Sequence, residues 1–280
     1  MKSVTILGSA AAEGIPAIFC NCRVCRHAWE NGGKDMRMRA AYKLNDHVRI
    51  DFGPDTMAQE FKYNLHSENL KHLFITHSHE DHFDTHYLFY RRPGFSVVDE
   101  DNILNIYGNV GVMNKLYSDM ARFRCDFKFY RMNPVEITAF QEIELPEEDM
   151  TFYALKANHM PSEEPNFYVF RWGDKWAMIA NDTGFFCEED WAFLKAKNIR
   201  FDLVITDCTG GKYDGRDGHM SGKWVIETKR RLEEMGFVDS ATKYYINHFS
   251  HNGHLTHEEF EAFYNPYGIQ IGYDGLEIEL

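Results

Sequence analysis

Short apolar segments rich in valine, isoleucine, phenylalanine and tyrosine recur along the chain, with the length that is typical of β-strands. They cover residues 4–7, 48–51, 72–76, 104–107, 151–157, 167–172, 176–180, 203–207 and 244–247. Apolar side chains spaced three and four positions apart predict helices over residues 55–63, 189–196, 222–235 and 256–263. Thr256 and Glu259 open the last of these with the spacing of a capping box. Strands and helices mixed along the whole chain favour a layered α/β fold.

The composition is that of a folded protein. The 280 residues are 44% hydrophobic, which is enough for a large core and excludes a disordered chain. No repeat, low-complexity segment or long linker divides the sequence, so we expect one domain over residues 1–280. The apolar part of the opening sequence MKSVTILGSA is too short for a signal peptide or a membrane span. We therefore expect a cytoplasmic protein with reduced cysteines and no membrane contact.

The net charge of the chain limits the classes of partner that it can bind. Forty-three acidic against thirty basic residues give a formal net charge of −13. A nucleic-acid-binding protein needs a basic face to neutralise phosphates, so we do not expect a nucleic-acid partner. A small anionic substrate is still compatible with this charge, because bound metal cations dominate the field inside a site.

The densest group of candidate ligands lies in FITHSHEDHFD, residues 74–84, where a polar segment follows an apolar strand. Alternate positions of an extended segment point the same way, so His77 and His79 can hold one ion. Asp81 and His82 are offset toward a second ion beside it. Imidazole and carboxylate suit zinc, manganese and iron alike. The alternative is a helix-capping loop that is rich in histidine by chance, and four candidate ligands within six residues disfavour it.

Three later candidates, His159, Asp182 and His248, each come directly after an apolar strand. Taken singly, each is equally compatible with a polar residue at the edge of the core. Residues at the ends of neighbouring strands converge in space on α/β sheets. Their shared placement therefore favours a common site with the histidine segment.

The combined pattern, H-x-H-x-D-H, a later histidine, Asp-Thr-Gly at 182–184 and a last histidine, resembles that of the metallo-β-lactamase superfamily. The resemblance implies an α/β fold, an αβ/βα sandwich of two mixed sheets flanked by helices, with two metals at one edge. Asp51, in the segment RIDFG, would orient one ligand. Diiron oxygen-reducing relatives carry an acidic residue at the position of His79, so this histidine favours hydrolysis. The metal ligands that the resemblance implies are His77, His79 and His159 for one ion, Asp81, His82 and His248 for the other, and Asp182 as the bridge.

Three cysteines in CNCRVC and a histidine near the C-terminus suggest a further metal site. If the chain folds as above, the loop after the first strand meets the loop after residue 247. Cys20, Cys22, Cys25 and His251 would then form a closed zinc site, which is structural because no position is left for substrate. Three incidental buried cysteines are the alternative. The remaining cysteines lack this spacing and are expected in the core or next to it; they are Cys125, Cys187 and Cys208.

The segment LGSAAAEGIPAIFCNCRVC, followed much later by NHFSH, is similar to the PhnP-like cyclic phosphodiesterases. It is also similar to the pyrroloquinoline quinone biosynthesis protein B group, which generally lacks the full set of hydrolytic ligands. The first resemblance implies a phosphodiesterase that opens a phosphoribosyl 1,2-cyclic phosphate with a hydroxide held between two metals, and a possible homodimer. It also implies that His219 donates a proton to the leaving oxygen and that Asp207 supports it. A histidine in a surface loop is the alternative for His219.

Two other function classes stay open. One is a different hydrolase of the same superfamily, a nuclease, lactonase or thioester hydrolase, and the other is a non-hydrolytic protein like the quinone-cofactor group. Extra residues follow His159, and residues 84–150 match no pattern, so the reaction class is better defined than the substrate. Arg37 and Arg39 could reach a substrate phosphate, but a place on the surface is favoured for both.

Overall fold

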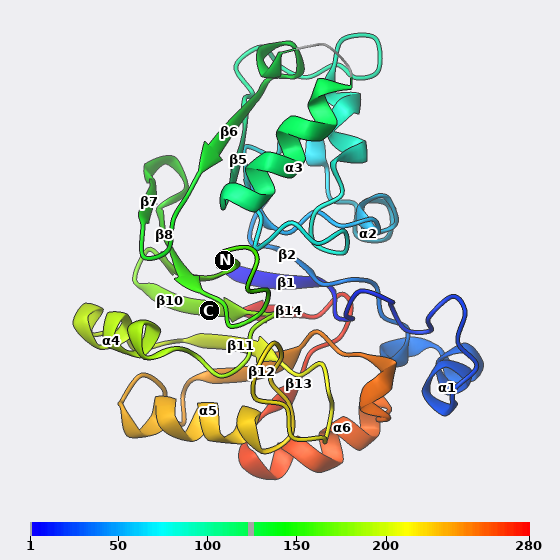
Figure 1. The fold of residues 1–280 in the computed structure, drawn as a ribbon, viewed down its shortest axis with the longest axis vertical. Helices are drawn as coiled ribbons and strands as arrows, with labels where there is room; N and C mark the ends of the chain where they lie inside the picture. The colour runs from blue at the N-terminus through cyan, green and yellow to red at the C-terminus, as the bar shows by residue number, and fades with distance from the viewer. Residues whose placement is uncertain (1, 123–125) are drawn as a thin grey trace.

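The computed structural model describes residues 2–122 and 126–280, in which two seven-stranded sheets pack face to face (Figure 1). The first sheet has the order β14-β1-β2-β3-β4-β5-β6 and the second β13-β12-β11-β10-β9-β8-β7. Both contain parallel and antiparallel pairs. The strands are β1 (Ser3–Gly8), β2 (Ala41–Lys43), β3 (Val48–Ile50), β4 (His72–Phe74), β5 (Leu104–Gly108), β6 (Met132–Glu136), β7 (Glu142–Leu145), β8 (Met150–Lys156), β9 (Asn166–Trp172), β10 (Lys175–Ala180), β11 (Leu203–Asp207), β12 (Lys243–Asn247), β13 (Gln270–Ile271) and β14 (Glu277–Glu279).

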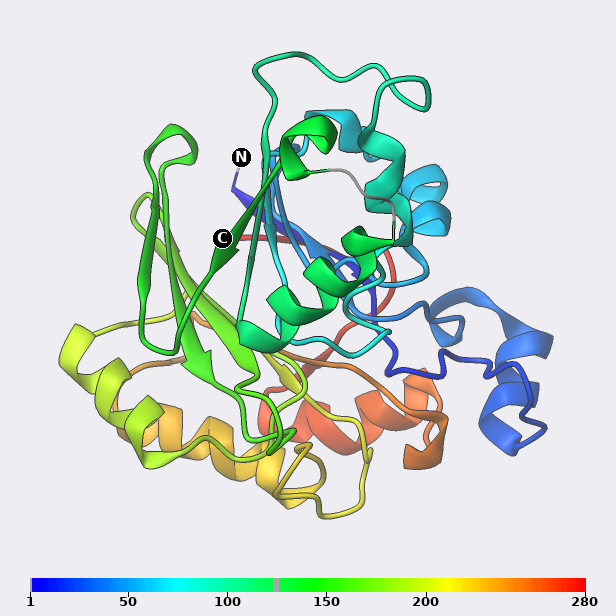
Figure 2. The ribbon, with the colours of Figure 1, turned by 45° about the horizontal axis from the view of Figure 1, so that its top comes forward.

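Helices flank the two sheets, as Figures 1 and 2 show. The α-helices are α1 (Arg23–Asn31), α2 (Thr56–Tyr63), α3 (Val110–Ala121), α4 (Glu188–Lys197), α5 (Lys223–Glu234) and α6 (His257–Tyr264). Helix α3 packs on the first sheet, and α4, α5 and α6 pack on the second. The predicted αβ/βα sandwich of two mixed sheets is thus confirmed. None of the helices in the described part of the chain has the length and apolarity that a membrane span requires.

The alternation of side chains along the strands builds a core on each face of both sheets. On β4, Phe74 points between the sheets and stacks on Phe152 of β8, with ring centroids 4.0 Å apart. Its neighbours Leu73 and Ile75 face the other way, toward α3. On β10, Ile179 lies between the sheets while Met178 packs with the helices of the second layer. Both faces of each sheet are therefore apolar, which explains the nearly continuous hydrophobic runs in the sequence.

All nine predicted strands and all four predicted helices are present within a few residues. Helix α6 begins with the predicted capping box, because the Thr256 hydroxyl accepts the N–H of Glu259 and the Glu259 carboxylate accepts the N–H of Thr256. The sequence did not predict strands β2, β6, β7, β13 and β14, which are two to five residues long, or helices α1 and α3. Cys187 and Cys208 lie in or next to the core, whereas Cys125 is outside the described residues.

Candidate metal centre

The carboxyl ends of six strands meet at one edge of the sandwich. They belong to β3 and β4 of the first sheet and to β8, β10, β11 and β12 of the second, where β8 runs parallel to β10 because both are antiparallel to β9. Asp51, Asp182 and His248 each stand at or just beyond a strand end with left-handed backbone, at φ of 64°, 48° and 63°. Such φ values are uncommon for residues other than glycine and cluster at functional sites.

A first group of ligand atoms comes from three histidines. His77 Nε2 lies 2.8 Å from His79 Nδ1, and His159 Nε2 lies 3.3 Å from the same atom. His159 Nδ1 donates to the carbonyl oxygen of Gly218 at 2.9 Å, so the lone pair of its Nε2 faces the other two rings. Ligands around one tetrahedral zinc lie roughly 3.3 Å apart, which these spacings approach.

A second group contains two histidines and a carboxylate, with Asp182 between the groups. His82 Nε2 lies 3.1 Å from Asp81 Oδ2, and His248 Nε2 lies 3.9 Å from that oxygen. Asp182 Oδ2 is 2.8 Å from His82 Nε2 and 2.9 Å from His248 Nε2. The other Asp182 oxygen, Oδ1, faces the first group at 3.8 Å from His159 Nε2. One carboxylate therefore offers one oxygen to each group, which is the arrangement of a bridging ligand.

Three buried atoms at the centre of this arrangement show that a cation fits there. His82 Nε2, His248 Nε2 and Asp182 Oδ2 are buried, and none has a hydrogen-bond partner among the described residues. Their separations of 2.8 and 2.9 Å are short, but the angles are not those of hydrogen bonds. A metal ion is bound by ligand atoms whose lone pairs point to a common centre and are not used in hydrogen bonds.

The pKa values of these histidines are shifted in different directions by their surroundings. Burial lowers the pKa of His77 and of His159, which leaves neutral imidazoles with free lone pairs. Burial also acts against a charge on His82 and His248, but nearby carboxylates, Asp182 foremost, outweigh it and raise the pKa of both. A cation held between these groups would neutralise the carboxylates and favour neutral histidine ligands.

Asp51 lies behind the second group. Its Oδ2 is 2.7 Å from His82 Nδ1, and its Oδ1 accepts the backbone N–H and the hydroxyl of Thr76 at 2.9 and 3.0 Å. A carboxylate on the far nitrogen of a ligating histidine fixes the tautomer and the orientation of the ring. Asp51 thus stands where the sequence predicted an orienting carboxylate.

His219 lies at the edge of the same site, on the side of the second sheet. Its Nδ1 is 3.0 Å from Asp207 Oδ2, and its ring centroid is 4.8 Å from that of His159. Asp207 is fully buried, whereas the side chain of His219 is 34% exposed. Burial opposes a charge on His219, but the Asp207 carboxylate outweighs this and raises its pKa. A partly exposed imidazole oriented by a buried carboxylate can donate a proton to a bound molecule.

The structure also brings the three cysteines and His251 together. Cys20 Sγ and Cys22 Sγ lie 3.4 and 3.5 Å from His251 Nδ1. The ligand atoms of Cys20, Cys22, Cys25 and His251 all lie within 4.8 Å of one another. The cysteines are free thiols, and their sulfur atoms also accept backbone N–H groups of Ala17, Cys22 and Cys25. The donor set is that of a tetrahedral zinc site.

The two ends of this cysteine cluster differ in their electrostatics. Burial raises the pKa of Cys25 to about 12. Burial also acts to raise the pKa of Cys22, but the N–H of Cys25 and the side chains of His251 and Cys20 lower it to about 6. Glu13 contacts the far side of the histidine, with its Oε1 3.4 Å from His251 Nε2, and accepts the hydroxyl of Ser250. Glu13 therefore joins the cysteine cluster to the loop that carries His248.

Several contacting residues were not predicted from the sequence. Thr209 Oγ1 lies 2.8 Å from His248 Nδ1 and 3.1 Å from His219 Nδ1, so it contacts both rings. Its place just after β11 is the one signal that the sequence offered. Arg37 was expected on the surface, and this was wrong: it is buried and donates to Ser9 Oγ at 2.9 Å. Arg39 is half-buried and pairs with Asp55 at 2.9 Å.

Comparison with solved structures gives several similar folds. A diphosphatase of the PhnP family has a TM-score of 0.78 at 23% identity, over all of this chain and 98% of that one. Zinc-bound PqqB from Methylobacterium extorquens has a TM-score of 0.75 at 17% identity, over 99% of this chain and all of the other. The short form of human tRNase Z has a TM-score of 0.66 at 18% identity, over 99% and 98% of the two chains. At these identities the likeness shows the fold.

Sequence comparison adds a relative and a family. An octanoyltransferase of Porphyromonas gingivalis is 26% identical over 282 residues, which take in 97% of this chain and 50% of that protein. This chain thus spans about half the length of that relative. Residues 47–249 match the family described as beta-lactamase superfamily domain. Since this match covers more than half of its 280 residues, the chain belongs to the β-lactamase superfamily, and it has the metallo-β-lactamase fold, which implies binding of divalent metal.

Proposed function

We propose that this protein is a metal-dependent phosphodiesterase that opens a small cyclic phosphate ester, of the phosphoribosyl 1,2-cyclic phosphate type. The observation that carries the proposal is the position of His219, which is held by the buried Asp207 beside two groups of metal ligands. An alkoxide leaving group needs a proton at neutral pH, so a proton donor next to a metal centre suits a phosphate ester of an alcohol.

The chain's own residues have distinct parts in this proposal. His77, His79 and His159 would hold one cation, while Asp81, His82 and His248 would hold the other, with Asp182 between them. Divalent cations bound there would lower the pKa of a coordinated water and neutralise charge on the phosphate. Asp51 and Thr209 orient the rings of His82 and His248 through their Nδ1 atoms.

His219 would act on the leaving group. Its Nδ1 faces Asp207 and Thr209, so Nε2 is the nitrogen left for the substrate. A water that has given up one proton to solvent joins phosphorus through its oxygen. As the bond between phosphorus and the ring oxygen breaks, the proton on Nε2 passes to that ring oxygen, and solvent later returns a proton to Nε2. The product is a phosphate monoester with a free hydroxyl group. The charge that develops on the imidazole as it is reprotonated is compensated by the Asp207 carboxylate.

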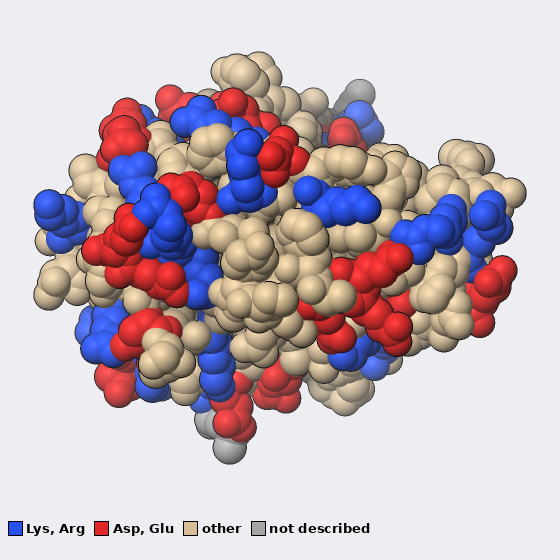
Figure 3. All heavy atoms as spheres, turned by 90° about the horizontal axis from the view of Figure 1, so that it is seen from below, with Lys and Arg blue, Asp and Glu red and all other residues tan. Residues whose placement is uncertain are grey.

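The formal net charge of −13 and the mixed charge on one face of the molecule support a small substrate rather than a nucleic acid. On the face shown in Figure 3, lysine and arginine side chains are interspersed with aspartate and glutamate. A nucleic acid is bound along a continuous basic track. A homodimer, which the resemblance implied, stays a prediction that sedimentation analysis can test.

A second candidate is an ester or thioester hydrolase that acts on an acyl group. It is favoured by the name of the curated relative, an octanoyltransferase, of which this chain matches half. The same metal ligands would serve both reactions, but a thiolate leaves without a proton, so His219 would have no role in cleavage of a thioester.

Metal analysis together with a substrate comparison tests the proposal. Metal-loaded protein should cleave bis(p-nitrophenyl) phosphate, and His77→Ala and Asp182→Ala should each reduce this turnover at least about a thousandfold, since the metals supply the nucleophile. His66→Ala, an exposed histidine away from the site, is the matched control and should be unchanged. Faster turnover of p-nitrophenyl octanoate than of the diester would favour the second candidate. A metal-loaded protein that turns over neither would favour a non-hydrolytic role.

A further inference from the structure

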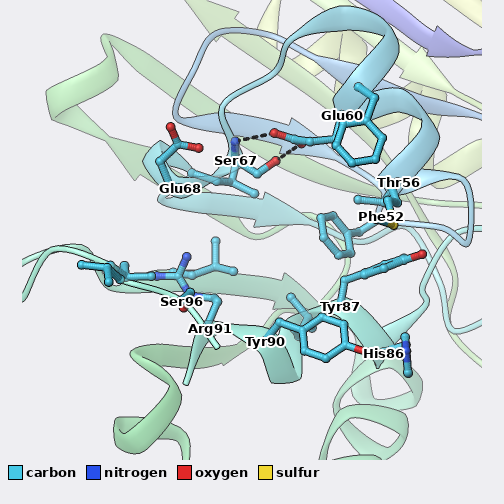
Figure 4. Close-up of a pocket in the computed structure, with 17 residues that line it drawn as sticks. Phe52, Thr56, Glu60, Ser67, Glu68, His86, Tyr87, Tyr90, Arg91 and Ser96 are labelled. Carbon is cyan, nitrogen blue, oxygen red and sulfur yellow. Dashed lines mark hydrogen bonds between the residues drawn. The ribbon is translucent and has the colours of Figure 1, made fainter. Parts of the chain in front are cut away.

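A second pocket, of about 740 Å³, lies apart from the metal ligands, between α2 and the 3₁₀-helix η3 (Thr85–Arg91) (Figure 4). None of the candidate metal ligands lines it. Phe52 forms part of its wall, and the backbone of Phe52 bonds to His82 and Asp84 at 2.8 Å each, so this backbone separates the pocket from the metal centre. Ligand pockets commonly measure about 300–1,000 Å³, and this volume lies within that range.

The lining of this pocket is mostly apolar. Leu70, Leu88 and Leu104 are buried at its base, and Phe61 and Val97 at its rim are 75% and 97% exposed. Large apolar side chains gathered at an exposed hollow commonly mark a binding site. In Figure 4, Phe52, Tyr87 and Tyr90 lie at one end of the hollow, and Arg91 and Ser96 lie toward the other.

The end with Arg91 carries positive charge that no acid neutralises. Arg91 donates to backbone carbonyl oxygens, among them that of Asn102 at 3.1 Å, and Arg131 donates to the carbonyl oxygen of Val98. Across the described residues, neither guanidinium has a carboxylate within 4 Å, although the chain has an excess of thirteen acidic residues. Burial, with a smaller effect of Arg131, lowers the pKa of Arg91 only to about 10, so it stays charged at neutral pH.

A hydroxyl group at the same end also has no partner. Ser96 Oγ is buried and makes no hydrogen bond to any described residue. The acids of the opposite wall are already engaged: Glu60 accepts the N–H of Ser67 at 2.8 Å, and Glu68 lies 3.0 Å from His66. A buried donor without an acceptor carries a cost that a bound acceptor removes.

We propose that this pocket binds a small amphiphilic anion, a medium-chain carboxylate. The carboxylate pairs with Arg91 and accepts the hydroxyl of Ser96, while the hydrocarbon chain lies along the apolar base toward Phe52 and Tyr87. The proposal does not depend on the reaction at the metal centre, because none of the candidate metal ligands lines this pocket.

Calorimetric titration of the full chain with sodium butyrate, hexanoate, octanoate and decanoate tests this proposal. Each added pair of methylenes should tighten binding about fifteenfold until the pocket is filled, which is about fourfold for each methylene buried. Octylammonium, which has the same tail and the opposite charge, should bind at least about tenfold more weakly than octanoate, because it meets Arg91 with like charge. Arg91→Gln should weaken octanoate binding at least about tenfold.

Two further variants distinguish a loss of octanoate binding from a loss of folding. Arg91 also binds backbone carbonyls, so Ser96→Ala serves as a second variant that leaves those contacts in place, and it should weaken octanoate binding about threefold to tenfold. Arg92→Gln is the matched control, since Arg92 stacks on Phe95 outside the pocket and should bind octanoate normally. Diester cleavage should be unchanged in all three variants.

Two outcomes would overturn the proposal. Octylammonium that binds as tightly as octanoate would show that the charge of Arg91 is not used. The other outcome is a pocket filled by a second copy of this chain, whose Ile18 and Phe19 are 79% and 102% exposed on the N-terminal loop. In that case sedimentation would show a dimer that both Phe19→Ser and Val97→Asp dissociate, and octanoate would not bind.

Discussion

The carboxylate of Glu163 holds Ser78 at two points: Oε1 accepts its backbone N–H at 2.9 Å and Oε2 accepts its hydroxyl at 2.6 Å. Ser78 stands between His77 and His79, so Glu163 fixes the segment that sets the spacing of these two rings. Gly111, near the N-terminus of α3, packs against Glu163 so closely that a Cβ there would lie 2.4 Å from Glu163 Cδ. The extra residues after His159 thus hold the segment that carries the candidate ligands His77 and His79.

Glu163→Ala should weaken metal binding at the site of His77 and His79 while the fold is retained. Hydrogen bonds to a charged acceptor contribute roughly 1.5–3 kcal/mol each. These hydrogen bonds hold His77 and His79 in the positions that metal binding requires. We therefore expect a loss of about tenfold to a hundredfold in metal affinity, as is typical for residues behind metal ligands. Equilibrium dialysis with metal analysis measures this loss without relying on turnover.

Glu164→Ala is the matched control for this change. The neighbouring Glu164 contributes its backbone carbonyl to Asn109, a contact that the substitution preserves, and so metal affinity should stay at the wild-type value. In a double-mutant cycle, Ser78→Ala should add little to Glu163→Ala, because the hydroxyl contact that Ser78→Ala removes is already lost in Glu163→Ala. Additive losses would mean that Glu163 does not act through Ser78.

His219→Ala should affect cleavage in proportion to how much the leaving group needs a proton. With a cyclic phosphate of an alcohol we expect kcat to fall about a hundredfold to ten-thousandfold, the usual contribution of a general acid. With bis(p-nitrophenyl) phosphate, whose leaving group is stable as an anion, the loss should be about tenfold or less. Steady-state kinetics on both substrates check this. The same loss on both would mean that His219 binds substrate or metal and donates no proton, and His254→Ala, an exposed histidine, should change neither.

Cys22→Ser should destabilise the protein before it affects the reaction. Loss of a structural metal belongs to the small group of changes that cost more than about 3 kcal/mol, which corresponds to a fall in Tm of roughly 6–12 °C for a chain of this size. Metal analysis should show one zinc fewer per chain, and calorimetry should show the fall in Tm. Cys187→Ser provides the comparison, since Cys187 lies at the start of α4, away from the cysteine cluster. An unchanged zinc content in Cys22→Ser would exclude the cysteine site.

The sequence predicted those parts of the fold and site that leave a local pattern. The metal-ligand candidates were found because each follows an apolar strand, and the alternation of residues around Phe74 and Ile179 marked the central strands. Strands β13 and β14 have two and three residues, too few for any periodicity to appear. They are ordered by pairing with neighbours that were already in place.

Contacts between distant segments left no pattern to find. Arg37 is buried because the carbonyl oxygen of Gly272 and the ring of His257 satisfy its guanidinium, and these partners lie 235 and 220 residues away. Glu163 lies 85 residues from Ser78, and nothing near either residue indicates the other. The residues behind the candidate ligands could therefore be found only from the tertiary structure, whereas the candidate ligands themselves could be found from their place after the strands.

Asp190 should make stability depend on pH in the acid range. It lies fully buried at the N-terminus of α4, where its carboxylate accepts the N–H of Lys156 at 3.0 Å and of Cys187 at 3.1 Å. Burial raises its pKa from 3.8 to about 6, although these hydrogen bonds act to lower it. The folded state therefore keeps this proton to a higher pH than the unfolded state does.

The stabilisation that Asp190 gives in its protonated form is complete below about pH 4 and is lost as the pH rises through about 6. A pKa difference of about two units corresponds to at most about 3 kcal/mol. Urea unfolding of the wild type and of Asp190→Asn, at intervals from pH 4 to pH 7.5, measures the difference between them. Because the variant cannot ionise at this position, the wild type should lose stability relative to it across this range. A constant difference between the two proteins, or one that grows in favour of the wild type, would show that the carboxylate is ionised at low pH and stabilised by the helix N-terminus.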